Sequence, residues 1–151
     1  MIHYRNDVRG SGVDARALKA TVKALLQALD EENSAVSISF VNDAAIRKIN
    51  REHRGKDAPT DVLSFPLIDD SMPDPEIGER LLGDIVISVD TARRQAAEYD
   101  APLQREIYRL VIHGLLHIMG HDHMEPDERA EMETQERRLA GVIHMPWPYE
   151  L

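Results

Sequence analysis

Four of the seven histidines in this 151-residue chain fall within one short stretch, residues 113 to 123. His113 and His117 are four residues apart, so on a helix their side chains project from one face, one turn apart. This spacing lets two imidazole nitrogens converge on one metal ion at about 2.0–2.1 Å. Gly120 is expected to end the helix, so that the chain turns back and brings His123 round as a third ligand. The pattern predicts a bound metal ion, with zinc as the candidate.

Three histidine ligands would leave a fourth coordination position open, which is typical of a catalytic zinc site. The chain has no cysteine, so thiolate zinc sites, disulfides and a cysteine nucleophile are all excluded. His121 is ambiguous: it could compete with His123 as the third ligand, carry a proton, or simply line the cleft. Asp122 is a candidate for orienting one of the ligands through a hydrogen bond. The alternative to a metal site is a surface cluster of histidines.

The residue after the first histidine of the motif is Gly114. Zinc peptidases with similar histidine spacing carry a glutamate there, which acts as the general base. Glycine cannot move a proton, although it would let a neighbouring element approach the helix closely. Peptide hydrolysis is therefore disfavoured, and metal-assisted hydrolysis of another substrate is favoured, with a bound water of pKa near ~7 as the nucleophile.

A basic segment precedes this region, although the whole chain has a net charge of −9. Arg54 is the best candidate for contacting a phosphodiester, because a planar guanidinium pairs with two non-bridging oxygens at once. We expect it in a polar loop before a strand, with Arg51 and Lys56 as further substrate contacts. The alternative is a solvated, positively charged helix face opposite an acidic one. Charge alone leaves the partner undecided. The basic residues of the segment are Arg47, Lys48, Arg51, Arg54 and Lys56.

The elements that must position these residues follow from hydrophobic periodicity and capping residues. Apolar spacing predicts helices after Asp14, after Asn42 or Asp43, after an Asp90 cap, from Pro102 to about Gly120, and from Pro126 to about Ala140. Alternation or apolar runs predict strands at Val36–Phe40, Asp61–Phe65 and Asp84–Ser88.

Together these elements predict an α+β fold: a small mixed sheet of about four strands covered by about five or six helices, with the metal site at a helix end. No linker or repeat divides the chain, so residues 1–151 are expected to form a single domain. Residues 69–79 should form an exposed loop, and the segment from Met145 to Tyr149 should pack against the body. Since no apolar run is long enough to span a membrane and no signal peptide is evident, a cytoplasmic location is expected.

Several segments together resemble one known family, the YbeY family of bacterial endoribonucleases. They are the stretch His113–His123, the segment Arg54-Gly55-Lys56-Asp57, the segment Pro59-Thr60-Asp61-Val62-Leu63-Ser64-Phe65-Pro66, and Leu82-Gly83-Asp84-Ile85. The acidic helix after His123 also fits, so the resemblance extends from about Asn42 to Ala140. The first forty residues match only in their layout of helix and strand.

The resemblance implies a metal-dependent RNase specific for single strands, acting in 3′-end maturation of small-subunit (16S) rRNA, ribosome assembly and ribosome quality control. The partners implied are single-stranded RNA, rRNA, the small ribosomal subunit and assembly factors, with no membrane. It also implies one Zn²⁺ per chain on His113, His117 and His123, and a functionally required arginine at Arg54. Ser64 and Asp84 fall in segments that the family places near the cleft, and His121 stands where some members carry tyrosine.

Two other functions remain as alternatives. The first is a zinc metallopeptidase-like hydrolase, against which Gly114 argues. The second is a non-catalytic, zinc-containing ribosome-assembly factor, in which the metal pins the helix end and the basic face binds rRNA. This second function predicts a closed fourth coordination position and ribosome binding that survives loss of a ligand.

Overall fold

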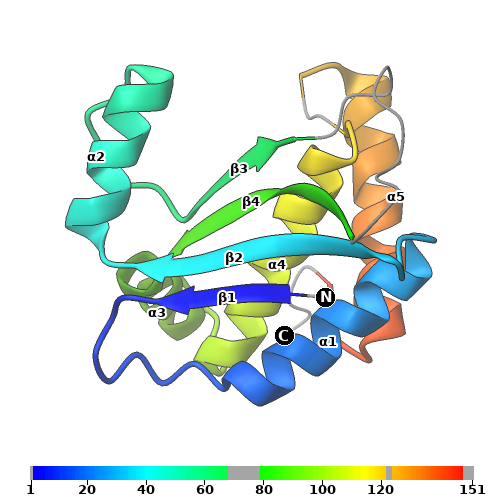
Figure 1. The fold of residues 1–151 in the computed structure, drawn as a ribbon, viewed down its shortest axis with the longest axis horizontal. Helices are drawn as coiled ribbons and strands as arrows, with labels where there is room; N and C mark the ends of the chain where they lie inside the picture. Colours follow the sequence, from blue (N-terminus) through cyan, green and yellow to red (C-terminus); the bar gives the residue numbers. More distant parts are fainter. Residues whose placement is uncertain (1, 68–78, 122–123, 148–151) are drawn as a thin grey trace.

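A computed structural model describes residues 2–67, 79–121 and 124–147 (Figure 1). The described part confirms the α+β class, with five helices and one mixed sheet of four strands. In chain order the elements are β1 Ile2–Asn6, α1 Ala15–Ala28, β2 Ser34–Val41, α2 Asp43–Arg54, β3 Val62–Pro66, β4 Arg80–Ser88, α3 Val89–Glu98, α4 Leu103–Ile118 and α5 Pro126–Val142.

The sheet has the strand order β1-β2-β4-β3. β1 and β4 both run parallel to β2, whereas β3 runs antiparallel to β4 and forms one edge of the sheet. The pairing aligns Ser64 with Ile85 and Phe65 with Asp84. Because paired residues point to the same face, this register decides which side chains of β3 can reach each neighbouring helix.

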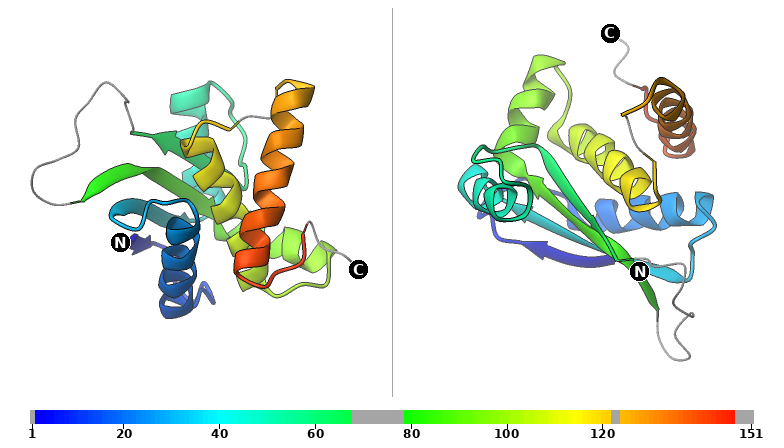
Figure 2. Two further views of the ribbon diagram at one scale, coloured as in Figure 1. Left: turned by 90° about the vertical axis from the view of Figure 1, so that its right-hand side faces the viewer. Right: turned by 90° about the horizontal axis from the view of Figure 1, so that it is seen from above.

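Different helices pack on the two faces of the sheet (Figures 1 and 2). The main core lies between one face and the helices α1, α4 and α5, with Ile85, Ile87 and Leu115 fully buried in it. On the other face α2 packs through a small cluster, in which Ile46 lies with Leu63 and Val86. The helix with the histidines and the helix with the basic residues therefore pack on opposite faces.

Two of the predicted helix caps are confirmed, and one is wrong. The side chains of Asp14 and Asn42 accept hydrogen bonds from the main chain at the starts of α1 and α2. The cap of α3 is Ser88 rather than Asp90, since the Ser88 hydroxyl accepts from Thr91 N at 3.3 Å. Asp90 lies in the first turn, where its carboxylate accepts from the N–H of Asp43 instead. A strand that ends on serine can therefore supply the next helix's cap directly.

The sequence pattern does not predict β1. Its side chains alternate between the core and solvent, but only Ile2 is a strongly apolar residue, so the alternation is weak in the sequence. The expected loop at 69–79 lies outside the described residues apart from Glu79. In the C-terminal segment, Met145 and Trp147 do pack against the main core, as expected. Among the described residues no helix is both long and apolar enough to cross a membrane.

Candidate active site

His113 and His117 meet on the last two turns of α4. Their Nε2 atoms are 3.1 Å apart, the rings are nearly perpendicular at 73°, and both side chains are half-buried. Two nitrogens that share one tetrahedral zinc ion at about 2.0–2.1 Å are separated by about 3.3 Å. The observed separation therefore suits ligation of a single metal ion without rearrangement of the helix.

The third predicted ligand, His123, and its neighbour Asp122 lie outside the described residues. Within residues 2–67, 79–121 and 124–147, no three His, Asp or Glu side chains form a metal-binding group. The two histidines of α4 fit zinc in both donor chemistry and spacing, and zinc on three histidines stays a prediction.

The end of α4 is built to turn the chain immediately after His117. Gly120 N–H donates to the carbonyl of His117 at 3.0 Å, and His121 N–H donates to that of Leu116 at 2.9 Å. These two bonds form a Schellman motif, which requires a left-handed residue, and Gly120 has φ of 99°. The expected stop at Gly120 is confirmed, because glycine takes this conformation without a steric penalty.

His121 follows this turn and is half-buried. It lines a hollow of about 260 Å³ together with Gly120 and three carboxylate residues at the start of α5, Asp127, Glu128 and Glu131. His121 thus lies between the C-terminal end of α4 and the carboxylate side chains at the start of α5. Its predicted roles, as proton carrier, competing ligand or lining residue, stay predictions.

Gly114 lets α4 pack tightly against the sheet, as the sequence suggested. A Cβ atom at this position would lie 3.1–3.2 Å from three atoms of the Ile85 side chain on β4. Gly114 itself is buried. The residue that follows the first of the two histidines is therefore a point of close contact between their helix and the sheet.

This contact predicts that Gly114→Glu destabilises the protein and adds no peptidase activity. A glutamate would meet Ile85 and place a carboxylate in an apolar interior, so we expect a loss of about 3 kcal/mol or more in the free energy of unfolding. Urea denaturation measures the loss, and a casein assay tests for proteolysis. A stable variant that hydrolyses casein with added zinc would show that the glycine does not exclude peptidase chemistry.

β3 carries Ser64 toward the histidine helix. Ser64 pairs with Ile85, whose side chain faces Gly114 of α4, so Ser64 shares that face of the sheet. Asp84 pairs with Phe65 and therefore lies on the opposite face. Both side chains are half-buried. The structure thus separates these two predicted residues by the thickness of the sheet, and their roles stay predictions.

Arg54 is the last residue of α2 rather than part of a loop, which corrects the expectation from the sequence. Gly55 follows it with φ of 70°, and its N–H donates to the carbonyl of Arg51 at 3.1 Å. The polar stretch with glycine resembled a loop, but it is a helix terminated by a left-handed glycine. Arg51, Arg54 and Lys56 are all exposed. They present positive charge at the C-terminal end of α2, where the helix dipole favours cations.

One basic residue of this segment is already paired within the chain. Arg47 donates to both carboxylate oxygens of Asp57, at 2.8 and 3.2 Å. Hydrogen bonding to Arg47 lowers the pKa of Asp57, so the pair stays charged at neutral pH. A second contact, from the buried Asn50 side chain to the carbonyl of Ala58, holds the chain after α2 against the helix. The segment that follows Arg54 is therefore fixed at two points.

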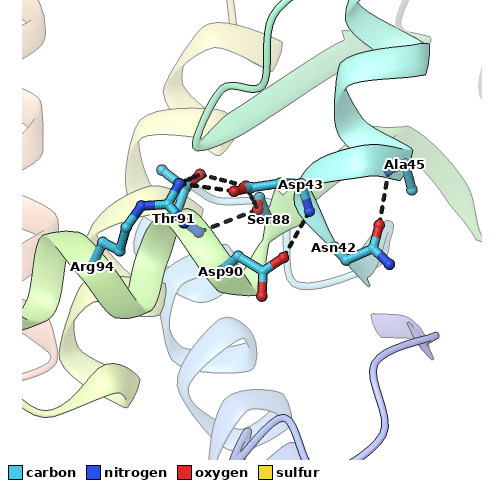
Figure 3. Close-up of polar contacts among 7 residues, drawn as sticks. All are labelled: Asn42, Asp43, Ala45, Ser88, Asp90, Thr91 and Arg94. Atoms are coloured by element: carbon cyan, nitrogen blue, oxygen red, sulfur yellow. Dashed lines mark hydrogen bonds and ion pairs between the residues drawn. The ribbon is translucent and has the colours of Figure 1, made fainter.

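The N-terminal end of α2 is tied to α3 by a network of polar contacts (Figure 3). The carboxylate of Asp43 accepts from the hydroxyls of Ser88 and Thr91, at 2.6 and 2.7 Å, and from Arg94 at 2.8 Å. Its own N–H donates to Asp90 at 2.9 Å. Burial raises the pKa of Asp43, but the hydrogen bonds from these three side chains outweigh burial and lower it overall. Together with the cluster around Ile46, this network holds the helix that carries Arg54.

We expect Asp43→Ala to lower the free energy of unfolding by about 2 kcal/mol at pH 7, because three donors lose a charged acceptor. The folded pKa lies below the ordinary value, so this contribution is present above about pH 4 and declines as the pH falls further. Chemical denaturation at pH 7 and pH 3 measures the difference. Asp43→Asn is the matched variant, since it keeps the shape and removes the charge. A constant difference at both pH values would contradict this assignment.

The predicted residues thus fall into two groups on either side of edge strand β3. His113 and His117 lie with Ser64 on the face covered by α4, while Arg54 belongs to α2 on the other face. Phe65 links the second group to the strand, since its ring lies 5.3 Å from that of His53 in an edge-on contact. A substrate that contacts both groups must cross β3 at the edge of the sheet.

A polar cluster on α4, N-terminal to the two histidines, was not predicted from the sequence. Glu106 of α4 is fully buried and accepts from Arg109 Nε at 2.7 Å, and Arg109 also lies 3.8 Å from Asp61, just before β3. This cluster joins the start of β3 to the histidine helix. Its signal in the sequence is a pair of charges three residues apart on an otherwise apolar helix face, which is also the signature of an exposed ion pair.

Glu136 of α5 is a second buried acid that the sequence did not single out. Burial raises its pKa to about 7, assisted by the charge of Glu133 and opposed by that of Arg109. The folded pKa exceeds the unfolded one, so stability falls as the pH rises from about 4.5 to 7. We expect Glu136→Gln to match the wild type at about pH 4 and to be more stable by up to about 3 kcal/mol at pH 8. Guanidinium denaturation at both pH values tests this, and equal stabilities at pH 8 would contradict it.

Comparisons with known proteins agree with this architecture. Residues 3–143 match the family described as "Endoribonuclease YbeY". Similar proteins of that name occur in Myxococcus xanthus, Persephonella marina and Desulfitobacterium hafniense, with 47%, 46% and 43% identity over 87%, 82% and 80% of this chain. The matches cover 45%, 76% and 79% of those proteins, so the chain spans under half of the Myxococcus relative.

The fold has also been observed in a solved structure. The solution structure of TM1509 from Thermotoga maritima aligns over the whole of both chains, with a TM-score of 0.62 and 23% identity, which supports the fold alone. The family match covers nearly the whole chain and includes both histidines of α4 and Arg54. The chain therefore belongs to the YbeY endoribonuclease family.

Proposed function

We propose that this protein is a metal-dependent endoribonuclease that cleaves single-stranded RNA in the 3′-end maturation of 16S rRNA. Membership of the YbeY endoribonuclease family supports the reaction class, hydrolysis of RNA phosphodiester bonds. The observation that carries the metal dependence is the pair of Nε2 atoms on α4, 3.1 Å apart and half-buried.

Residues on one side of β3 would bind the metal, and residues on the other side would bind the phosphate. His113 and His117, with His123, would hold zinc, which when bound supplies Lewis-acid activation of water and of phosphoryl oxygens. Arg54 would bind and neutralise the non-bridging oxygens of the scissile phosphate, aided by Arg51 and Lys56. All three are exposed, so they are accessible to a polyanion.

Several groups remain candidates for moving the proton to the leaving oxygen. His121 lies between the second and third predicted ligands in the sequence and is a candidate proton carrier. Ser64 faces α4 and could donate a hydrogen bond to a bound phosphate. Asp84 lies on the other face of the sheet, where it could contact substrate beyond β3.

The histidines of α4 and the basic residues of α2 lie on either side of β3, and this arrangement supports a preference for single-stranded RNA. A substrate phosphate must contact basic residues on one side of an edge strand and a metal on the other. A flexible single strand can bend over such an edge, whereas an A-form duplex is stiff and wide. The net charge of −9 suggests few phosphate contacts, so affinity should be modest and fall with added salt.

The proposal extends to the cellular setting. It places the protein in the cytoplasm, with rRNA as substrate and with the small ribosomal subunit and assembly factors as partners in ribosome assembly and quality control. A non-catalytic assembly factor, in which the metal pins the helix end and the basic face binds rRNA, is the second candidate. A peptidase is disfavoured, because Gly114 is buried against Ile85 and leaves no room for a general base.

The experiment uses an end-labelled transcript spanning the 3′ end of 16S rRNA and its downstream extension. We expect zinc-loaded protein to cleave the free transcript and to leave it intact when a complementary strand is annealed over the junction. Equal cleavage of both forms would contradict single-strand specificity. Absence of cleavage, together with binding to small subunits in sedimentation, would favour the assembly-factor function.

A further inference from the structure

α1 forms a basic surface remote in sequence from all the residues discussed so far. Its three charged side chains are Arg16, Lys19 and Lys23, and the helix contains no acidic residue. The three positions are spaced by three and four residues, so they lie along one side of the helix. All three are exposed. In a protein of net charge −9, such a surface selects a negatively charged partner.

A cavity of about 430 Å³ lies beside these lysines, between α1 and the start of β1. Val22 and Leu26, which are buried in the core, and the half-buried Ile2 supply its apolar lining, and Lys19, Lys23 and Glu32 supply the polar part. Lys19 Nζ also lies 5.7 Å from the centre of the Tyr4 ring on β1. The cavity can therefore accept an aliphatic side chain while both lysines face a carboxylate.

β1 presents main-chain N–H and C=O groups beside this cavity. Among the described elements it pairs only with β2 and forms the free edge opposite β3 (Figure 1). Asp7 N–H donates to the carbonyl of Phe40 on β2, so the main-chain groups of residues 3, 5 and 7 point toward β2. Those of Ile2 and Tyr4 consequently point away from the sheet. An unpaired edge of this kind is a template for another strand.

We propose that β1 and α1 form a docking site for an acidic, extended segment of another protein. The segment adds to β1 as a further strand, inserts one aliphatic side chain into the cavity lined by Val22 and Leu26, and places carboxylates near Lys19 and Lys23. Main-chain pairing supplies affinity, and the cavity with its two lysines supplies specificity, as in other cases of strand addition.

A protein segment fits this surface better than RNA does. A nucleic-acid backbone lacks the regularly alternating N–H and C=O groups that pair with a strand edge residue by residue. The cavity lining is aliphatic, whereas single-stranded RNA is held mainly by stacking on aromatic rings. The proposal is independent of the proposed function, because none of the candidate active-site residues contributes to this surface.

The test uses ¹⁵N-labelled full-length protein and an eight-residue peptide, Glu-Ser-Glu-Ser-Val-Ser-Glu-Ser, blocked at both ends, whose valine and glutamates share one face when it is extended. We expect amide shifts concentrated at residues 2–6 and along α1. We also expect at least a tenfold weaker Kd for the double variant Lys19→Glu/Lys23→Glu. Both lysines are exposed, so the variant should fold and cleave RNA within a few-fold of the wild-type rate. The same peptide with lysine in place of each glutamate should not bind.

The matched control is Arg9→Glu/Arg137→Glu, which changes the net charge equally at two other exposed positions. It should bind the acidic peptide as the wild type does. Three results would overturn the proposal: no shifts in β1, equal binding by both double variants, or displacement of the peptide by a single-stranded RNA oligomer. The last result would assign the basic surface to RNA.

Discussion

Replacing His117 with alanine is expected to remove both zinc and RNA cleavage, with a rate loss of at least about 1,000-fold. His113 and His117 place their Nε2 atoms 3.1 Å apart, so each depends on the other to form the site. Loss of one imidazole leaves only two of the three predicted ligands, too few for a catalytic zinc site, which typically has three protein ligands. The variant should remain folded, since His117 is only half-buried and alanine favours helix.

Zinc content after dialysis and cleavage of a single-stranded RNA measure the two effects together. His3→Ala is the matched control, because His3 is exposed on β1, on the side of the sheet away from β3. His121→Ala and His123→Ala distinguish the two candidates for the third ligand, and we expect only the second to lose zinc. A His117→Ala protein that kept full turnover would exclude this histidine from the mechanism.

Reversing the charge of Arg54 should have the second-largest effect on the RNA cleavage rate, after replacement of His117. Arg54→Glu is expected to keep zinc and to lose at least about 100-fold in cleavage rate, because an attractive contact with the phosphate becomes repulsive. Arg54 is exposed at the end of α2 and away from the main core, so the fold should be unaffected. Arg54→Lys should be intermediate, since lysine keeps the charge but loses the planar pair of donors.

Lys48→Glu is the matched control for this prediction. It lies on the same helix, is also exposed, and changes the net charge by the same amount. We expect its rate to change by no more than a few-fold, through weaker long-range attraction of RNA. If both reversals lowered the rate equally, Arg54 would contribute only to the overall positive electrostatic potential of α2. A separate measurement of Kd and of the single-turnover rate would then locate the loss in binding.

The sequence predicted the parts of the fold that depend on local chemistry. Asp14 and Asn42 were identified as caps because their side chains can accept from the next turn, and Gly120 as a stop because it takes a positive φ. Gly114 was expected to allow a close approach, and the structure identifies Ile85 as its neighbour. Each of these features is decided by a few adjacent residues.

Features that depend on pairing between distant segments could not be predicted in the same way. The placement of Ser64 and Asp84 on opposite faces follows from the register of β3 on β4, which no local pattern fixes. The pair of Glu106 and Arg109 looks like a surface pair in sequence, and the burial of Glu106 depends on how β3 and α3 pack against α4. β1 is stabilised by β2 rather than by its own residues, so its weak alternation gave no clear signal.

The measurement that tests the central claim most directly is cleavage of an end-labelled single-stranded RNA by the wild type and by Arg54→Glu. Each protein is assayed with zinc present and after chelation. The account predicts that only the zinc-loaded wild type cleaves, and that zinc restores activity to the chelated wild type but not to the variant. Absence of cleavage by a demonstrably zinc-loaded wild type would contradict it, and so would full cleavage by Arg54→Glu.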